Sequence, residues 1–462
     1  NHKLTWYNGY MDMSEAEVRD GEDEKERAVR MRWNHQYIIN STLKGEHLFL
    51  SGGALRLNWS AVLSKAFSET PDNAEIYLLG SHVSTTDAAK RRWEHNSDKD
   101  KAGYVDLAYK LKLDGGAVLD FSAGGMYRDK KRDSFFNEYT FNSATGSKNP
   151  QYINKDWFNF DEIQFVPRPY GNIGDPLNYD ATEKIGAGYG MVKYTLKEWE
   201  LIAGVRVEHT NQGYVLKFPR DVEGNQDYTD VLPSFHAKYG IHRNANLRFS
   251  YARAINRPSF FEIVPYSIIN EDYKEKGNPD LKHTVADNID LRYEFFPKSS
   301  EQFMVGLFYK NIQDPIEYGL LNEGQDTYYK PMNFGDAKNL GMEVDVMKYF
   351  NWFGIKANYT YTHSKVTTDK RIMEGSEVKS VRQSRPLFGQ AAHVANLSLL
   401  FKETRHGWEG QVSASYTGKR LSDISNWYED DIWEDGYAQL DASIEKSFKN
   451  GISIFGKASN LL

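Results

Sequence analysis

Segments in which apolar and polar residues alternate at every position follow one another along almost the whole chain. In the clearest of them, Leu55, Leu57 and Trp59 occupy one set of alternate positions while Arg56 and Asn58 occupy the other. Successive side chains of a β-strand point to opposite faces, so each such segment predicts a strand with one apolar and one polar face. About seventeen segments of this kind predict an all-β chain.

The connections between these segments alternate between very short turns and long polar stretches. Glycine, proline and asparagine mark the short turns, which we expect at 51–53, 114–116, 197–199, 242–246, 297–300 and 449–451. Long connections are expected at 69–101, 130–183, 212–230, 258–285, 314–336, 365–390 and 419–435. Short periplasmic turns and long extracellular loops are typical of an outer-membrane barrel. The pattern predicts a transmembrane antiparallel up-and-down β-barrel over residues 1–462, with ligand recognition in the long loops.

A water-soluble β-sandwich is the main structural alternative, because its strands also alternate. The interior of a sandwich is dry, however, whereas charged residues repeatedly occupy the face opposite the apolar one in this chain. Aromatic residues near the segment ends, such as Trp199, Tyr251 and Trp352, suit the aromatic girdles of a membrane barrel. We therefore favour the barrel, crossing the outer membrane of a Gram-negative bacterium many times.

Composition agrees with this fold. The chain has 462 residues, of which 14% are aromatic, and its mean hydropathy is −0.66. Barrel strands are only half apolar, so they leave no long apolar run of the kind that a spanning helix needs. The chain has no cysteine, which is compatible with an oxidising envelope compartment. Its net charge of −7 gives no basic footprint, so we expect no nucleic acid partner.

Several short motifs resemble those of one family. Ser250–Phe260 contains Arg257-Pro258, and the segment Gly277–Lys282 contains Asn278, Pro279 and Leu281. The stretches 333–337, 341–343, 439–441 and 459–462 carry further similar motifs in the same order. Together they resemble the β-barrel of TonB-dependent outer-membrane receptors.

The resemblance implies a 22-stranded barrel that is filled by an N-terminal plug domain and energised by the TonB complex of the inner membrane. The chain starts at Asn1 without a signal peptide and ends directly after the segment 452–458, although an open sheet edge in a bilayer leaves backbone groups unsatisfied. We therefore expect further strands at both ends, and the plug and the TonB-binding segment upstream.

Charged residues on the inner face are the candidates for contact with a plug. A barrel of this width encloses an aqueous lumen that is blocked when idle. An equally good alternative is that these charges are hydrated or paired across neighbouring strands. The candidates are Arg206, Glu208, His236, Arg292, Glu294 and Glu343.

Aromatic residues in the long loops are the candidates for ligand binding. Aromatic faces interleaved with amides and carboxylates suit siderophores, cyclic peptides and sugars. The alternative is that they form small cores that hold the loops together. The candidates are Tyr152, Trp157, Phe158, Tyr170, Tyr266, Tyr273, Trp427 and Trp433.

Acidic clusters at 20–24 and 423–435 offer hard oxygen ligands, so Ca²⁺ in the extracellular loops is an expectation, although solvated carboxylates are the commoner explanation. Neither cluster has the spacing of an EF-hand. No other metal or cofactor is predicted.

Function remains open between three classes. The resemblance implies a receptor that imports a scarce nutrient, such as a siderophore, cobalamin, a peptide or a glycan. The alternatives are a passive porin and a non-transporting surface-assembly scaffold; an outer-membrane enzyme is disfavoured because the sequence has no Gly-x-Ser-x-Gly or His-Glu-x-x-His motif. Haem receptors of the family carry a histidine between the two motifs, and none lies between Pro258 and Asn278. Expected partners are outer-membrane lipid and lipopolysaccharide, the TonB complex and a surface lipoprotein.

Overall fold

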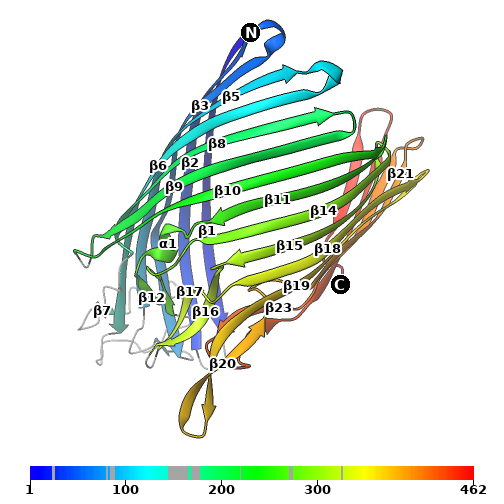
Figure 1. Ribbon diagram of the computed structural model, residues 1–462. Coiled ribbons are helices and arrows are strands. Elements are labelled where there is room, and N and C mark those ends of the chain that lie inside the picture. The colour runs from blue at the N-terminus through cyan, green and yellow to red at the C-terminus, as the bar shows by residue number, and fades with distance from the viewer. Residues whose placement is uncertain are drawn as a thin grey trace.

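The computed structural model describes residues 1–22, 26–79, 82–83, 89–143, 165–167, 177–218, 220–269, 274–323 and 326–462. Antiparallel strands form one large curved sheet in these residues (Figure 1). Consecutive strands pair with each other in the order β1, β2, β3, β5, β6, β8, β9, β10, β11, β14, β15, β18, β19, β21, β22, β25, β26. We call these strands the strand wall.

Most strands in the first half of the wall are longer than those in its second half, although β11 has only 12 residues and β19 has 22. Their bounds are β1 His2–Glu22, β2 Glu26–Phe49, β3 Leu55–Leu79, β5 Ala89–Lys112, β6 Val118–Ser143, β8 Tyr179–Leu196, β9 Trp199–Leu216, β10 Glu223–His242 and β11 Ala245–Asn256. Those of the second half are β14 Thr284–Lys298, β15 Glu301–Gln313, β18 Ala337–Phe350, β19 Phe353–Glu374, β21 His393–Glu403, β22 Trp408–Thr417, β25 Tyr437–Ser447 and β26 Ser453–Ala458.

The number of strands in the wall agrees with the sequence-based expectation. Within the described residues the large sheet has twenty strands. Three of them, β4 (His82–Val83), β7 (Phe165–Pro167) and β20 (Glu377–Arg385), extend its loop end only, which leaves seventeen in the wall. In this part of the chain β1 pairs only with β2, and β26 only with β25, so the sheet is curved and open.

The two faces of the wall differ as the alternation predicts. On β9, Glu208, Thr210 and Gln212 contact the segment that follows β11, which identifies their face as the inner one. The alternate residues Val205 and Val207 are exposed on the outer face. Leu291 and Leu307, which oppose each other across β14 and β15, are exposed on the same outer face. Exposed apolar side chains on one continuous face form the lipid-facing belt of a membrane barrel.

The short turns lie at one end of the wall and the long connections at the other, as predicted. Several of the expected bounds of the long connections were wrong. Residues 69–101 were expected to be a loop, but β3 continues to Leu79 and β5 begins at Ala89. Similarly, β6 continues to Ser143, β10 already begins at Glu223, and β19 continues to Glu374, all within stretches that were expected to be loops. A spanning strand needs about 10 residues, so these strands project well beyond a bilayer. Both faces of a projecting strand contact water, which removes the alternation by which strands were recognised although the backbone pairing continues.

A second sheet lies inside the curve of the wall at the end with the long connections (Figure 1). Its strands pair in the order β12, β13, β17, β16, β23 and β24. The bounds are β12 Ser267–Ile269, β13 Lys274–Lys276, β16 Ile316–Glu323, β17 Asp326–Asn333, β23 Arg420–Ser425 and β24 Ile432–Glu434. Together with the short helix α1, Phe260–Ile263, this sheet forms what we call the loop layer.

The main hydrophobic core of the described residues lies between the loop layer and the wall. Phe260, Ile263 and Leu281 of the loop layer and its flanking segment pack against Phe136 and Tyr179 of the wall. Inside the described ranges, no helix has the length and apolar character required to cross a bilayer. Burial therefore concentrates where long connections fold back over the inner face.

An arginine in place of Leu291 tests the assignment of the outer face. This leucine is 42% exposed near the middle of the apolar belt of β14. We expect Leu291→Arg to destabilise the folded barrel by about 2–4 kcal/mol, because the charge would lie in hydrocarbon. Ser250→Arg is the matched control, since Ser250 lies in the neighbouring strand on the inner face beside Asp290. Urea titration of full-length protein in lipid vesicles measures both, and equal stabilities would contradict the assignment.

Candidate functional site

The chain turns inward directly after β11, and Arg257 fixes this turn to the wall. Its guanidinium group donates to the carboxylate of Glu208 and, at 3.0 Å, to the hydroxyl of Thr210. Glu208 is buried and also accepts from Arg206. Gln212 donates to the carbonyl of Pro258 at 2.9 Å. The Arg-Pro motif therefore attaches the start of the loop layer to β9, because the arginine supplies the charge and the proline ends the strand.

Helix α1 begins with a capping box. Ser259 accepts from the backbone of Glu262 at 3.3 Å, and the Glu262 carboxylate accepts from the Ser259 backbone at 2.6 Å. Glu262 also accepts from the hydroxyl of Tyr318 in β16, at 3.0 Å. Burial raises the pKa of Tyr318, so this hydroxyl stays protonated and remains a donor. These bonds join α1 to the second sheet.

The second family-like motif closes the same segment. The amide of Asn278 donates to the carbonyl of Pro331 at 2.9 Å and accepts from the backbone of Asp280 at 3.1 Å. Leu281 is buried in the core, while Pro279 is exposed. A Cβ atom at Gly277 would lie 1.8 Å from the carbonyl oxygen of Val264, so only glycine fits there. The motif thus holds the returning chain against β17.

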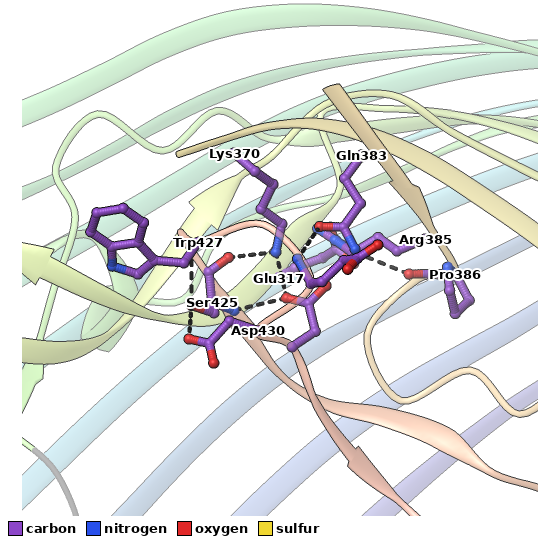
Figure 2. Close-up of polar contacts among 10 residues, drawn as sticks. Glu317, Lys370, Gln383, Arg385, Pro386, Ser425, Trp427 and Asp430 are labelled. Carbon is purple, nitrogen blue, oxygen red and sulfur yellow. Dashed lines mark hydrogen bonds and ion pairs between the residues drawn. The ribbon is translucent and has the colours of Figure 1, made fainter. Parts of the chain in front are cut away.

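Two buried ion pairs join the long connections that contain residues 317, 370–385 and 431 (Figure 2). Arg385 donates two hydrogen bonds of 2.9 Å to Glu317, and their side chains are only 1% and 3% exposed. Glu317 also accepts from the backbone of Phe388 at 2.8 Å. Bidentate geometry offsets the cost of removing both charges from water. Residue 317 belongs to β16 and residue 385 to β20, so the pair joins two connections.

The second pair adds the connection between β22 and β25. Lys370 of β19 donates to Asp431 and to the carbonyl of Ser425. Burial lowers the pKa of Lys370, although the neighbouring carboxylate of Asp431 acts in the opposite direction. Ser425 also donates to Asp430 at 2.9 Å and accepts from the backbone of Trp427 at 3.1 Å, as Figure 2 shows. The three connections therefore form one cross-linked unit.

These buried pairs were not anticipated from the sequence. A signal was present, because Arg385-Pro386 repeats the Arg-Pro dipeptide of Arg257-Pro258. Both arginines lie where a strand ends, and each binds a buried glutamate. The identity of the glutamate, 208 or 317, depends on how the connections fold and could not be read from the chain.

The candidate lumen charges are largely engaged with one another. Arg206 pairs with Glu208, and Arg292 donates to Glu343 at 3.1 Å. Glu294 is buried and accepts from Arg248 at 2.8 Å. His236 is exposed on the inner face of β10, the face that also carries Asp230 and Ser234. Pairing across neighbouring strands was one of the two sequence-based alternatives, and of these pairs only Arg248–Glu294 joins neighbouring strands, β11 and β14. Contact with a plug stays a prediction.

The candidate ligand-binding aromatics fall into two groups. Tyr266 is buried in the core, Trp427 is half-buried beside Ser425, and Trp433 is exposed with the Lys419 ammonium 5.6 Å from its ring centre. Tyr152, Trp157, Phe158, Tyr170 and Tyr273 lie outside the described residues. The burial of Tyr266 agrees with the alternative in which loop aromatics form a core.

The carboxylates considered for Ca²⁺ are dispersed among cationic partners. Asp20 pairs with Arg27, Asp431 with Lys370, and Glu434 with Arg420. Within the ranges that the structure describes, no group of three or more His, Cys, Asp or Glu side chains has the geometry of a metal site. Calcium binding stays a prediction.

Replacing Arg385 tests whether the buried pair holds the connections together. Arg385→Met would leave the Glu317 carboxylate buried without its cation, and we expect about 3–5 kcal/mol less protection of the loop layer. Arg382→Met in the same hairpin is the control, since Arg382 is 82% exposed and its partner Asp369 is exposed as well. Amide hydrogen exchange of β16 and β20 reads out the effect. Unchanged protection in Arg385→Met would contradict the role of the pair.

Comparison with known proteins agrees with the fold and the motifs. The family profile "TonB dependent receptor-like, beta-barrel" matches residues 40–461. Among solved structures, the unliganded ferric citrate transporter FecA is similar with a TM-score of 0.64 at 10% identity, over 98% of this chain and 65% of that one. The siderophore receptor PiuA from Acinetobacter baumannii has a TM-score of 0.62 at 13% identity, over 100% of this chain and 70% of that one.

The ferric preacinetobactin receptor BauA from Acinetobacter baumannii is also similar, with a TM-score of 0.59 at 10% identity, over 98% of this chain and 68% of that one. No curated protein sequence matches. The chain thus spans about two thirds of the length of these receptors. Identities this low establish a shared fold, whereas the profile match covers nearly the whole chain. The chain belongs to the TonB-dependent receptor family and comprises β-barrel sequence of that family.

Proposed function

We propose that this chain forms the barrel of an outer-membrane receptor that imports a scarce nutrient with energy from the TonB complex. The observation that carries the proposal is the loop layer, which folds inward over a polar inner face and is fastened there by buried charges. A layer of this kind narrows the entrance to the lumen and presents rigid binding groups. Family membership supports transport rather than catalysis.

A plug domain upstream of this chain completes the proposed receptor. The chain spans 65% of the ferric citrate transporter, so such a receptor has room for a plug and further strands. The paired charges on the inner face, including Arg206–Glu208 and Arg292–Glu343, offer the plug a surface of alternating sign. Ion pairs that are partly exposed exchange readily for contacts with a docking domain, because each contributes little by itself.

Ferric siderophores are the first ligand class to test. The similar structures include a ferric citrate transporter, a siderophore receptor and a ferric preacinetobactin receptor. Cobalamin, peptides and glycans are the other classes that a TonB-dependent receptor of this type would import. A surface lipoprotein that covers the loop layer and Ca²⁺ in the acidic connections belong to the same proposal.

Dependence on TonB distinguishes active import from a passive pore. The full-length receptor, produced in a host that lacks its own siderophore receptors, should restore uptake of one radiolabelled ferric siderophore from a panel. We expect uptake to fall to background when TonB is depleted, because release of a plug needs energy from the inner membrane. Uptake that persists without TonB would identify a passive porin. A scaffold would give no uptake of any member of the panel, of cobalamin, of peptides or of glycans.

Trp433 is the most exposed of the three candidate ligand-binding aromatics that the structure describes. It is 40% exposed on the loop layer, and Trp408, also 40% exposed, lies at the end with the short turns and is the matched control. We expect Trp433→Ala to weaken binding of the imported ligand about two- to tenfold, the contribution of one aromatic contact. Trp408→Ala should leave the affinity unchanged in the same equilibrium titration. Equal affinities of both variants and the parent would exclude Trp433 from the binding site.

A further inference from the structure

Five lysines on the outer face of four neighbouring strands form two adjacent rows, which we call the lysine rows. Lys65 of β3, Lys99 of β5 and Lys131 of β6 lie directly opposite one another across their strands. The second row, one step nearer to the short turns, contains Lys101 of β5 and Lys184 of β8, with Asp129 of β6 between them. Lys99, Lys131, Lys101 and Lys184 are exposed.

The lysine rows lie at the edge of the apolar belt on the side of the long connections. On the outer face of β5, Leu107 and Val105 are exposed, Gly103 follows, and Lys101 and Lys99 come next. The outer positions from Leu113 to Gly103 cover about 25 Å along the membrane normal at the usual strand tilt, which is the height of a barrel's apolar band. Tyr127 of β6, opposite Gly103, supplies an exposed aromatic ring at this border. The ammonium groups therefore lie at the headgroup level of one leaflet.

In the part of the chain that the structure describes, these lysines have no acidic partner. Within the described residues, none of the five makes an ion pair within 4.0 Å, including with Asp129. The nearest ring contact places the Lys65 ammonium 5.3 Å from the centre of the Tyr37 ring. The row beyond them contains Asp133 and Asp180, but both carboxylates pair with Lys217, at 2.6 and 3.4 Å.

The inner face of the same strands is the internal comparison. There, Arg128 binds Asp100, and Lys130 and Arg132 bind Asp98. Sequence neighbours thus alternate between paired cations inside and unpaired cations outside. Like charges directly opposite each other destabilise a sheet, so a row of three lysines in register needs an external anion to offset the repulsion.

We propose that the lysine rows bind the phosphate groups of the phosphorylated glycolipid that forms the outer leaflet, lipid A of lipopolysaccharide. The inference rests on the proposed function, because it requires that the long connections face outward from an outer membrane. Neighbouring strands are about 4.8 Å apart, so the row of Lys65, Lys99 and Lys131 spreads three ammonium groups over roughly 10 Å. This width suits a phosphorylated disaccharide. Lysine binds phosphate as a flexible point charge, and its stem extends along apolar surface while the ammonium group reaches the headgroups.

Rings beyond the lysine rows suit the sugars of the same lipid. Phe67 of β3, His95 of β5 and Phe135 of β6 stack in one column on the outer face, with ring centres 5.9 and 5.0 Å apart. Aromatic rings pack favourably against sugar rings, and this column lies where the saccharide core would extend from the membrane. Acyl chains would contact the apolar belt below.

The test compares lipid binding by variants of the full-length receptor in detergent. Native mass spectrometry counts bound bis-phosphorylated lipid A during titration, with dephosphorylated lipid A as the second probe. The variant Lys65→Gln/Lys99→Gln/Lys131→Gln should bind bis-phosphorylated lipid A about 100-fold more weakly, since each lysine at an anionic membrane surface contributes about fivefold. Lys65→Arg/Lys99→Arg/Lys131→Arg keeps the charge and should bind normally. Lys449→Gln, in a short turn, is the control for nonspecific charge effects.

Two results would overturn the proposal. One is unchanged binding by the glutamine triple variant while its heat-resistant, folded mobility in electrophoresis matches the parent. The other is equal binding of phosphorylated and dephosphorylated lipid by the parent protein. TonB-dependent uptake, measured with the same variants, separates this proposal from the proposed function. If the glutamine triple variant binds lipid A as the parent does while uptake still depends on TonB, only the lipid A proposal is overturned. Failure of the parent protein to reach the outer membrane would instead refute both.

Discussion

Alternation of side chains between the two faces of a paired strand is the constraint on which the structure depends. In hydrocarbon, every backbone N–H and C=O must find a partner, and neighbouring strands supply it. Once the backbone is paired in this way, each residue is committed to lipid or to the interior. Leu291 and Leu307 lie outside, whereas Glu208 and Glu294 lie inside and bind arginines. The ion pairs of the inner face follow from the same commitment, since charges that share that face meet across strands.

The loop layer is held together in a different way. Its strands are short, and side chains rather than long ladders connect them. Arg257 binds Glu208 where β11 ends, and Arg385 binds Glu317 where β20 ends. For ion pairs that are this buried, the free-energy cost of desolvation offsets much of the attraction between the charges. Their contribution therefore lies mainly in specifying one arrangement of the connections. A receptor needs such an arrangement if its entrance is to present the same binding surface each time.

The lysines on the outer face are arranged differently from the charges of the inner face and of the loop layer. The lysine rows face away from the interior and make no ion pair within the described residues, although Arg128 and Lys130 on the inner face of the same strands are paired. This asymmetry suits an environment that contributes its own anions. Under the proposal that the lysine rows bind lipid A, the membrane is a partner with two chemistries, hydrocarbon along the belt and phosphate at its edge.

The sequence by itself determined the all-β fold, the seventeen strands of the wall and the end of the wall at which each short turn lies. It also determined the faces of residues such as Val205 and Arg206, because alternation and turn chemistry are local. It also contained the motifs around Arg257 and Asn278 that resemble the family. Strand length beyond the bilayer could not be read, since water on both faces removes the alternation. Only the tertiary structure decided that Glu208 and Glu317 receive the two arginines and that Lys65, Lys99 and Lys131 align. These contacts join residues far apart in the chain, and their register depends on the summed pairing of every strand between them.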